Sequence, residues 1–166
     1  NYYAKKIGLE NTNFRNATGW PDPKHYTSAR DLIKLANALI DEYPQYLKYY
    51  SELDFTYNNI TQGNRNPLLY KNLGADGLKT GHTTQSGYGL VASVVRGHRR
   101  VLLVINGLNS IKERSNEAER LIDWSFRNFE NYTLFNSNQP IKKVSVWLGK
   151  TQDLSLVLKD DLILTL

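Results

Sequence analysis

Two apolar runs, Gly87 to Arg96 and Arg99 to Leu108, constrain the fold of this chain more than any other feature. Both are dense in Val, Leu and Ile, and the Gly97-His98 pair between them is typical of a tight hairpin turn. We therefore predict two antiparallel strands that pair with each other. Because apolar side chains fill most positions of both strands, the sheet should be covered on both faces or nearly so.

Helices are predicted on both sides of this hairpin. Ser28 is placed to cap a helix, and apolar residues at helical spacing follow it, so residues 28–42 are predicted to be helical. A second, short helix is predicted over residues 44–50, with a Pro in its first turn. After the hairpin, a Ser-x-x-Glu capping box at Ser110 predicts a helix over residues 111–130.

Other stretches before the hairpin are rich in turn-forming residues. Residues 1–26 hold many Asn, Gly and Pro residues and are predicted to be loop. Phe55-Thr56-Tyr57 is predicted to be a short strand, followed by a loop over residues 58–67. Arg65 lies in this loop between two Asn residues, a setting in which an Arg side chain is usually solvated.

The sequence pattern changes after Tyr132. Residues 136–140 have the composition of a linker, and beyond them apolar and polar residues alternate in three successive segments. We predict one domain over residues 1–135, then a linker and the first strands of a β-rich domain over residues 136–166. Three strands hardly bury two faces, so we expect this second domain to be incomplete.

The segment Asp76-Gly77-Leu78-Lys79-Thr80-Gly81-His82 precedes the hairpin and carries the most suggestive chemistry. It places a cation beside a hydroxyl, which together can hold a carboxylate, and a Gly that lets another backbone come close. Lys-Thr-Gly is also the third signature of the penicillin-recognising serine acyl enzymes. By itself, the tripeptide indicates no more than an exposed turn before a strand.

Composition argues against several other functions. The net charge is +5, but Lys and Arg are scattered and form no basic stripe among aromatic residues, so nucleic acid is not an expected partner. The chain has no Cys and only 3 dispersed His residues, so neither a metal site nor another cofactor is expected. No apolar run approaches the roughly 20 residues of a membrane span.

Several stretches, taken in order, resemble one enzyme family. They are His25 to Asp31, Gly63 to Asn66, Asp76 to His82, Gly87 to Ser93, and the helix with Arg114 and Glu117 that ends Trp124-Ser125-Phe126. In this order and spacing they resemble the D-alanyl-D-alanine carboxypeptidases, the low-molecular-mass penicillin-binding proteins. The resemblance covers nearly the whole chain. It implies an α/β (α+β) fold of the penicillin-binding, β-lactamase-like transpeptidase type: an antiparallel sheet with packed helices and Lys79 to Gly81 on an edge strand, then the start of an all-β domain.

The resemblance implies acyl transfer through a serine ester. In the family, a Ser in a Ser-x-x-Lys motif attacks the bond between two D-alanines, and a Ser-x-Asn motif shuttles protons. Neither motif occurs in this sequence, and in the family both lie upstream of the point that matches Asn1. We therefore expect a fragment that is inactive alone, an expectation that the absent initiator Met and signal peptide also fit.

Four consecutive residues acquire catalytic and substrate-binding roles from the resemblance. Lys79 sets a positive potential beside the nucleophile and the substrate carboxylate, and Thr80 donates its hydroxyl to that carboxylate. Gly81 lets the substrate backbone lie along the strand edge. The backbone N–H of His82 is one of two oxyanion-hole donors, a group worth roughly 10²–10³ in rate in other acyl-transfer enzymes.

Two arginines match family positions near the carboxylate end of the cleft. Arg65 and Arg114 are therefore predicted to bind substrate. For Arg114 the alternative is a helix ion pair with Glu117, worth a few tenths of a kcal/mol. His25 and His98, in a loop and a hairpin turn, have no predicted function.

Three hypotheses about function remain open. The first is a cofactor-independent serine D-Ala-D-Ala carboxypeptidase that acts on peptidoglycan stem peptides ending in D-Ala-D-Ala and is acylated by β-lactam antibiotics. The second is a non-catalytic module that binds cell-wall peptide or a partner protein. The third is a serine β-lactamase, against which the β-rich segment after residue 140 argues. The first implies a place outside the cytoplasmic membrane, in the periplasm or at the cell surface, often with a tethering C-terminal amphipathic helix that this sequence lacks.

Overall fold

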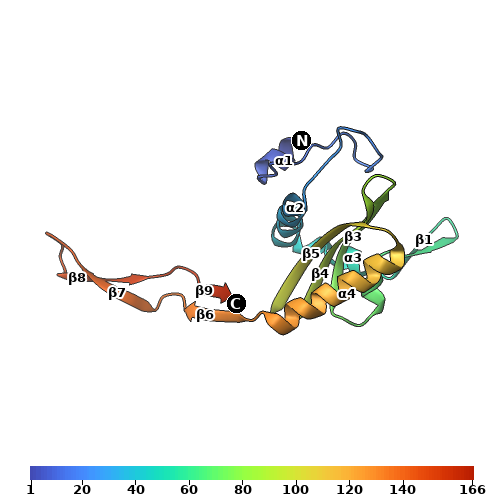
Figure 1. Cartoon of the computed structure of the whole chain (residues 1–166). Coiled ribbons are helices and arrows are strands. Elements are labelled where there is room, and N and C mark those ends of the chain that lie inside the picture. The colour runs from blue at the N-terminus through green and yellow to red at the C-terminus, as the bar shows by residue number, and fades with distance from the viewer. The chain divides into compact units, whose positions relative to one another are not determined.

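The predicted hairpin belongs to a three-stranded antiparallel sheet (Figure 1). In this computed structural model, which describes all 166 residues, β4 spans Gly87–Arg96 and β5 spans Arg99–Leu108. Gly97 between them has a φ of +62°, which suits a tight turn. The third strand, β3 (Ala75–Thr83), pairs with β4, so the order is β3-β4-β5 and β3 lies at an edge.

Two long helices pack on this sheet. α2 (Ala29–Glu42) begins after Ser28, whose hydroxyl accepts a 3.2 Å hydrogen bond from the backbone N–H of Asp31, and it contacts β4 and β5. α4 (Ile111–Asn128) runs across the sheet in Figure 1. The buried apolar side chains of the core come from the strands, both helices and a short 3₁₀ segment; they include Ala36, Leu68, Leu78, Leu90, Ala92, Val94, Ala118 and Ile122.

The helices differ from the predictions in detail. The loop predicted over residues 1–26 is wrong at its start, because Tyr2–Lys6 form the short helix α1. The single helix predicted over residues 44–50 is instead two pieces, the 3₁₀ helix η1 (Pro44–Tyr46) and α3 (Lys48–Ser51). At the start of α4, the Glu113 carboxylate reaches one residue further back than a capping box requires and accepts a hydrogen bond from the backbone N–H of Asn109.

The loop predicted over residues 58–67 contains a strand. β1 (Asp54–Tyr57) pairs antiparallel with β2 (Ile60–Gly63). Asn58 and Asn59 between them have φ values of 48° and 60°, as a two-residue type I′ turn requires. Two consecutive Asn residues tolerate this backbone well and were the missed signal of a hairpin. The 3₁₀ helix η2 (Pro67–Tyr70) follows.

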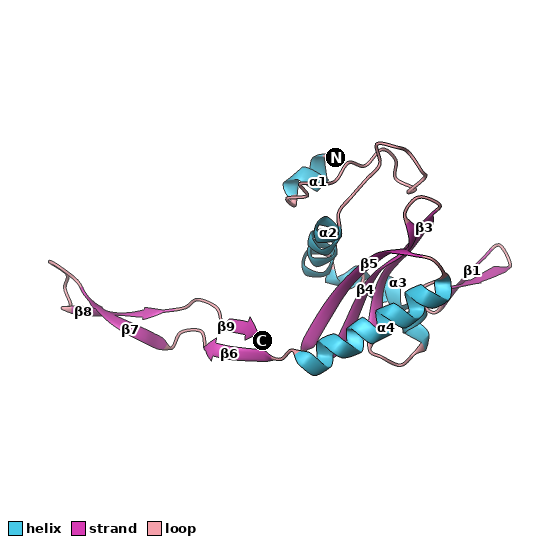
Figure 2. Cartoon of the chain, in the orientation of Figure 1, coloured by secondary structure: helices cyan, strands magenta, loops and turns pink.

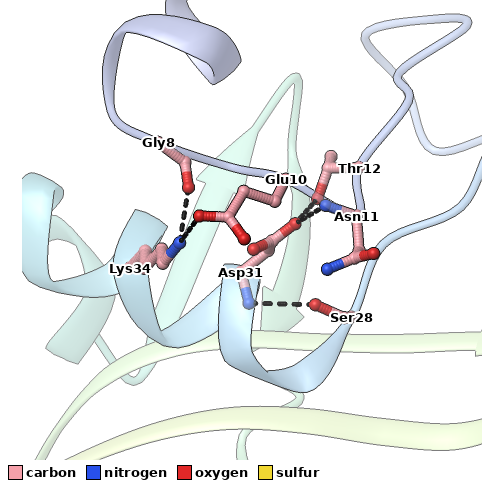
Figure 3. Close-up of polar contacts among 7 residues, drawn as sticks. All are labelled: Gly8, Glu10, Asn11, Thr12, Ser28, Asp31 and Lys34. Carbon is pink, nitrogen blue, oxygen red and sulfur yellow. Dashed lines mark hydrogen bonds and ion pairs between the residues drawn. The ribbon is translucent and has the colours of Figure 1, made fainter.

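A buried carboxylate fixes the segment that precedes α2 (Figure 3). Asp31 is fully buried, and its Oδ2 accepts hydrogen bonds of 2.7 Å from the backbone N–H of Asn11 and from the hydroxyl of Thr12. One turn later, the Nζ of Lys34 donates to the carbonyl of Gly8 at 2.6 Å. These bonds hold the preceding chain against the first turns of α2.

Residues 125–166 form a second compact unit that is rich in strands (Figure 2). Its four strands are β6 (Asn131–Phe135), β7 (Pro140–Ser145), β8 (Asp153–Val157) and β9 (Leu162–Thr165). β6 pairs with β9 and β7 with β8, so the strand that the alternation pattern did not predict, β6, pairs with the last one. The domain division at residue 135 stays a prediction.

The architecture confirms the predicted fold class, an antiparallel sheet with packed helices followed by a β-rich segment. No helix has both the length and the apolar composition that crossing a bilayer requires. No group of three or more His, Cys, Asp or Glu side chains is arranged to hold a metal ion.

Candidate functional site

The segment with the suggestive chemistry lies on the edge strand β3. Its residues Lys79 to His82 are paired with β4, with Thr80 opposite Leu90 and His82 opposite Tyr88. No strand of this chain pairs with the other edge of β3. Because that edge offers unpaired backbone groups, an extended peptide can add to it as a further strand.

The four residues of this segment differ in exposure. Lys79 and His82 are exposed, and the Nζ of Lys79 donates a hydrogen bond to the carbonyl of Thr80. Thr80 itself is buried. At Gly81 the space is open, because an added Cβ would meet nothing within 4 Å. The strand therefore has room for another backbone at the position where the sequence predicts one.

A cavity of about 450 Å³ opens beside the same segment. Lys79, Thr80 and Asn106 contribute polar groups to a wall that is otherwise mainly apolar, with Leu, Ala and Tyr side chains from α2 and α3. Asn106 lies close over Gly89, where an added Cβ would be 2.2 Å from its Oδ1. A Cβ at position 89 would therefore force the Asn106 side chain to shift from its place in the cavity wall.

His82 is stacked on an aromatic ring. The ring centroids of His82 and Tyr88 are 4.0 Å apart, with an angle of 30° between the ring planes. The Cζ of Arg114, on α4, lies 5.8 Å from the centroid of the same Tyr88 ring. Tyr88 therefore contacts two of the residues that were predicted separately from the sequence.

Arg114 is a buried cation without a carboxylate partner. Its side chain is 5% exposed, its guanidinium NH2 group donates to the carbonyl of Arg65 at 3.3 Å, and its Nε has no hydrogen-bond partner. Burial lowers the pKa of Arg114 because it disfavours the charged form, an effect that the nearby Tyr88 opposes. The alternative ion pair with Glu117 does not form, since Glu117 pairs with Arg120 at 2.8 Å.

The loop that carries Arg65 is fixed by the two flanking Asn residues. The side-chain oxygen of Asn64 accepts from the backbone N–H of Asn66 at 3.0 Å, and the Nδ2 of Asn66 donates to the carbonyl of Gly77 on β3 at 2.8 Å. The Arg65 side chain is exposed, but its carbonyl binds Arg114. The loop is therefore an ordered bridge between β3 and α4.

Asp76, at the start of the segment, joins three strands. Both of its carboxylate oxygens accept hydrogen bonds from one guanidinium nitrogen of Arg100 on β5, at 2.9 and 2.7 Å. The same nitrogen contacts the hydroxyl of Ser93, which is fully buried on β4. Asp76 thus stabilises the position of β3 in the sheet.

Sequence reasoning missed three side chains beside the predicted site: Tyr88, Asn66 and Asn106. The position of Tyr88 could have been predicted from the sequence, because a short turn after Thr83 places Tyr88 opposite His82 in the strand register. The Asn66 contact with Gly77 spans 11 positions of sequence, and no local pattern indicates it. In the sequence Asn106 is an ordinary strand residue, and only the structure shows that its side chain lies close to Gly89.

Both units of the chain match known protein families in sequence. Residues 1–110 match the sequence profile described as D-alanyl-D-alanine carboxypeptidase, and residues 129–166 match that of the penicillin-binding protein 5 C-terminal domain. D-alanyl-D-alanine carboxypeptidase DacA of Haemophilus influenzae is 40% identical over 158 residues, which are 94% of this chain. The chain spans about 40% of the length of that curated relative.

Solved structures share the fold. Penicillin binding protein 5 from Haemophilus influenzae matches 99% of this chain with a TM-score of 0.93 and 39% identity, and the match covers 48% of that protein. Penicillin-Binding Protein D2 from Listeria monocytogenes, in its ampicillin-bound form, matches 75% of this chain and 53% of its own, with a TM-score of 0.70 and 29% identity.

Proposed function

The chain belongs to the D-alanyl-D-alanine carboxypeptidase family, and we propose that it forms the substrate-holding part of a serine-type carboxypeptidase that removes the terminal D-alanine from peptidoglycan stem peptides. The observation that carries this proposal is the free edge of β3, which presents Lys79, Thr80 and Gly81 in succession. A peptide that ends in a carboxylate can pair with this edge while a cation and a hydroxyl bind the carboxylate.

Each residue of the edge has a distinct proposed role. Lys79, exposed beside the cavity, attracts the terminal carboxylate, and the hydroxyl of Thr80 donates a hydrogen bond to it. The open space at Gly81 accommodates the substrate backbone. The backbone N–H of His82 donates to the oxygen that becomes negative during acyl transfer.

Arg65 and Arg114 are proposed to bind the carboxylate end of the peptide. The support is the state of Arg114, a buried guanidinium whose Nε is unpaired and which no carboxylate of the chain neutralises. Buried charges are normally paired, so an anionic ligand suits this position. The exposed side chain of Arg65 belongs to the loop that accepts the Arg114 hydrogen bond.

The nucleophile is proposed to come from residues outside this sequence. Residues 1–166 contain neither a Ser-x-x-Lys nor a Ser-x-Asn motif. We therefore propose that the chain by itself binds stem peptides without turnover, and that the complete site is acylated by β-lactams. The ampicillin-bound relative supports β-lactams as ligands of this kind of site. A peptidoglycan substrate also favours a location outside the cytoplasmic membrane.

Peptide binding by the 166-residue chain tests the proposal. We expect diacetyl-L-Lys-D-Ala-D-Ala, but not its L-Ala-L-Ala counterpart, to shift the backbone amide resonances of Lys79 to His82. Lys79→Ala should weaken binding about tenfold or more, because a hydrogen bond to a charged group contributes about 1.5–3 kcal/mol. Lys150→Ala, at an exposed position in the second unit, is the matched control. Equal binding of the two peptides would contradict the proposal.

The intact mass of the chain after incubation with a labelled penicillin tests the missing nucleophile. We expect no stable adduct. A stoichiometric adduct would show that a Ser or Thr among these residues is an activated nucleophile, and the proposed division of the site would then be wrong.

A further inference from the structure

We infer that Tyr88 is a positioning residue that holds both His82 and Arg114, a role that rests on the proposed function. Tyr88 is not among the residues predicted to catalyse or to bind substrate. Its ring contacts His82, at the proposed oxyanion end of the site, and Arg114, at the proposed carboxylate end.

The contact with His82 follows from the strand register. His82 and Tyr88 are cross-strand partners in β3 and β4, so their side chains lie on the same face of the sheet. Their ring centroids are 4.0 Å apart, closer than the roughly 4.5–7 Å of most aromatic pairs. The His82 side chain is exposed and makes no hydrogen bond to the chain, so the Tyr88 ring is the contact that restricts its rotation.

The contact with Arg114 orients a buried cation. The guanidinium Cζ is 5.8 Å from the Tyr88 centroid, within the roughly 6 Å range of a cation–π interaction. Hydrogen bonding constrains Arg114 only weakly, because its bond to the Arg65 carbonyl is 3.3 Å long and its Nε is unpaired. The aromatic ring therefore supplies much of the orientation of this side chain.

One ring thus restrains two side chains at opposite ends of the proposed site: the imidazole of His82, whose backbone N–H is the proposed oxyanion donor, and the guanidinium of Arg114. Displacing a group in such a site by about 1 Å can lower a rate about 10²-fold. Neither contact uses the Tyr88 hydroxyl. A Phe ring at this position should therefore retain both contacts, whereas a Leu side chain should lose them.

NMR of the isotope-labelled 166-residue chain tests the role. In the wild-type chain we expect nuclear Overhauser effects between the rings of His82 and Tyr88, upfield-shifted imidazole protons, and couplings of a single His82 rotamer. Tyr88→Leu should abolish the upfield shift and average the rotamers, and Tyr88→Phe should restore both. The methyl resonances of buried Leu68 report whether each variant is folded. In the same samples, Tyr88→Leu should weaken binding of the D-Ala-D-Ala peptide about threefold to tenfold.

The outcomes separate this inference from the proposed function. A wild-type chain that does not bind the peptide contradicts the proposed function. A wild-type chain that binds it, with a folded Tyr88→Leu variant that binds equally well and keeps one His82 rotamer, overturns the role of Tyr88. Absence of Overhauser effects between the two rings in the wild-type chain overturns it without any variant.

Discussion

Asn66 and Gly77 are joined by a 2.8 Å hydrogen bond from the Asn66 Nδ2 to the Gly77 carbonyl, which connects the Arg65 loop to the strand that carries Lys79. The side-chain oxygen of Asn66 also accepts a 3.1 Å bond from the backbone N–H of Leu68. With 1% of its surface exposed, Asn66 is a buried amide that bonds at both ends. The Asn66 side chain therefore helps to fix the position of the loop, together with Asn64 and Arg114.

Asn66→Ala should lower the free energy of unfolding by about 1–3 kcal/mol, because it leaves buried backbone groups without partners. Urea unfolding measures the change. Asn66→Asp, which keeps the acceptor but loses the donor to Gly77, should also destabilise. Gln45→Ala, at an exposed position of η1, should change the stability by no more than about 0.5 kcal/mol. An Asn66→Ala effect within that range would contradict the importance of the bridge.

Gly74→Ala should destabilise more than Gly97→Ala, although both residues have a positive φ. At Gly74 an added Cβ would lie 2.2 Å from the Val95 carbonyl oxygen, whereas at Gly97 it would meet nothing within 4 Å. The Gly97 variant should lose only the roughly 1–2 kcal/mol of the backbone conformation. The Gly74 variant must also move β3 away from β4. Thermal unfolding of the two variants gives the difference, and equal losses would show that the close approach is not important.

Asp31 should make stability fall in acid. Burial acts to raise the pKa of the Asp31 carboxyl, but hydrogen bonds from Thr12, Asn11 and Glu10, with the charge of Lys34, lower the pKa overall. Its contribution is therefore fully present above the ordinary carboxyl pKa of about 3.9, and it is lost as pH falls through the lowered folded value.

Asp31→Asn should be less stable than the wild-type chain at pH 7 and lose less stability between pH 5 and pH 2. Urea unfolding across this range measures both effects. Asp41→Asn, at an exposed position of α2, is the control and should keep the wild-type pH dependence. An unchanged pH dependence in Asp31→Asn would mean that the lowered pKa does not contribute to stability.

Leu68→Ala should cost about 2–5 kcal/mol, because Leu68 is fully buried and its truncation leaves a cavity. Ile111→Ala removes a side chain that is 59% exposed at the first residue of α4, and it should cost well below 1 kcal/mol. Calorimetry of the two variants compares them. Similar losses would show that the core does not close around Leu68.

The elements that the sequence predicts well are those with a local cause. The β4–β5 hairpin and the start of α2 at Ser28 follow from apolar patterning, turn residues and a helix cap, which act over a few neighbouring residues. The predictions that were wrong also concern short local segments. The short helix α1 has little apolar periodicity, and the composition around the Asn58-Asn59 turn is that of an ordinary loop.

Covalent order is enough to predict that Lys79, Thr80, Gly81 and His82 follow one another along β3. The neighbours of these residues depend on how the chain folds. Packing of α4 and the Arg65 loop brings Arg114 to Tyr88, and the strand register brings Tyr88 to His82. Such contacts depend on burial and close packing between segments far apart in the chain. No short sequence pattern predicts them, because the packing is a property of the whole fold.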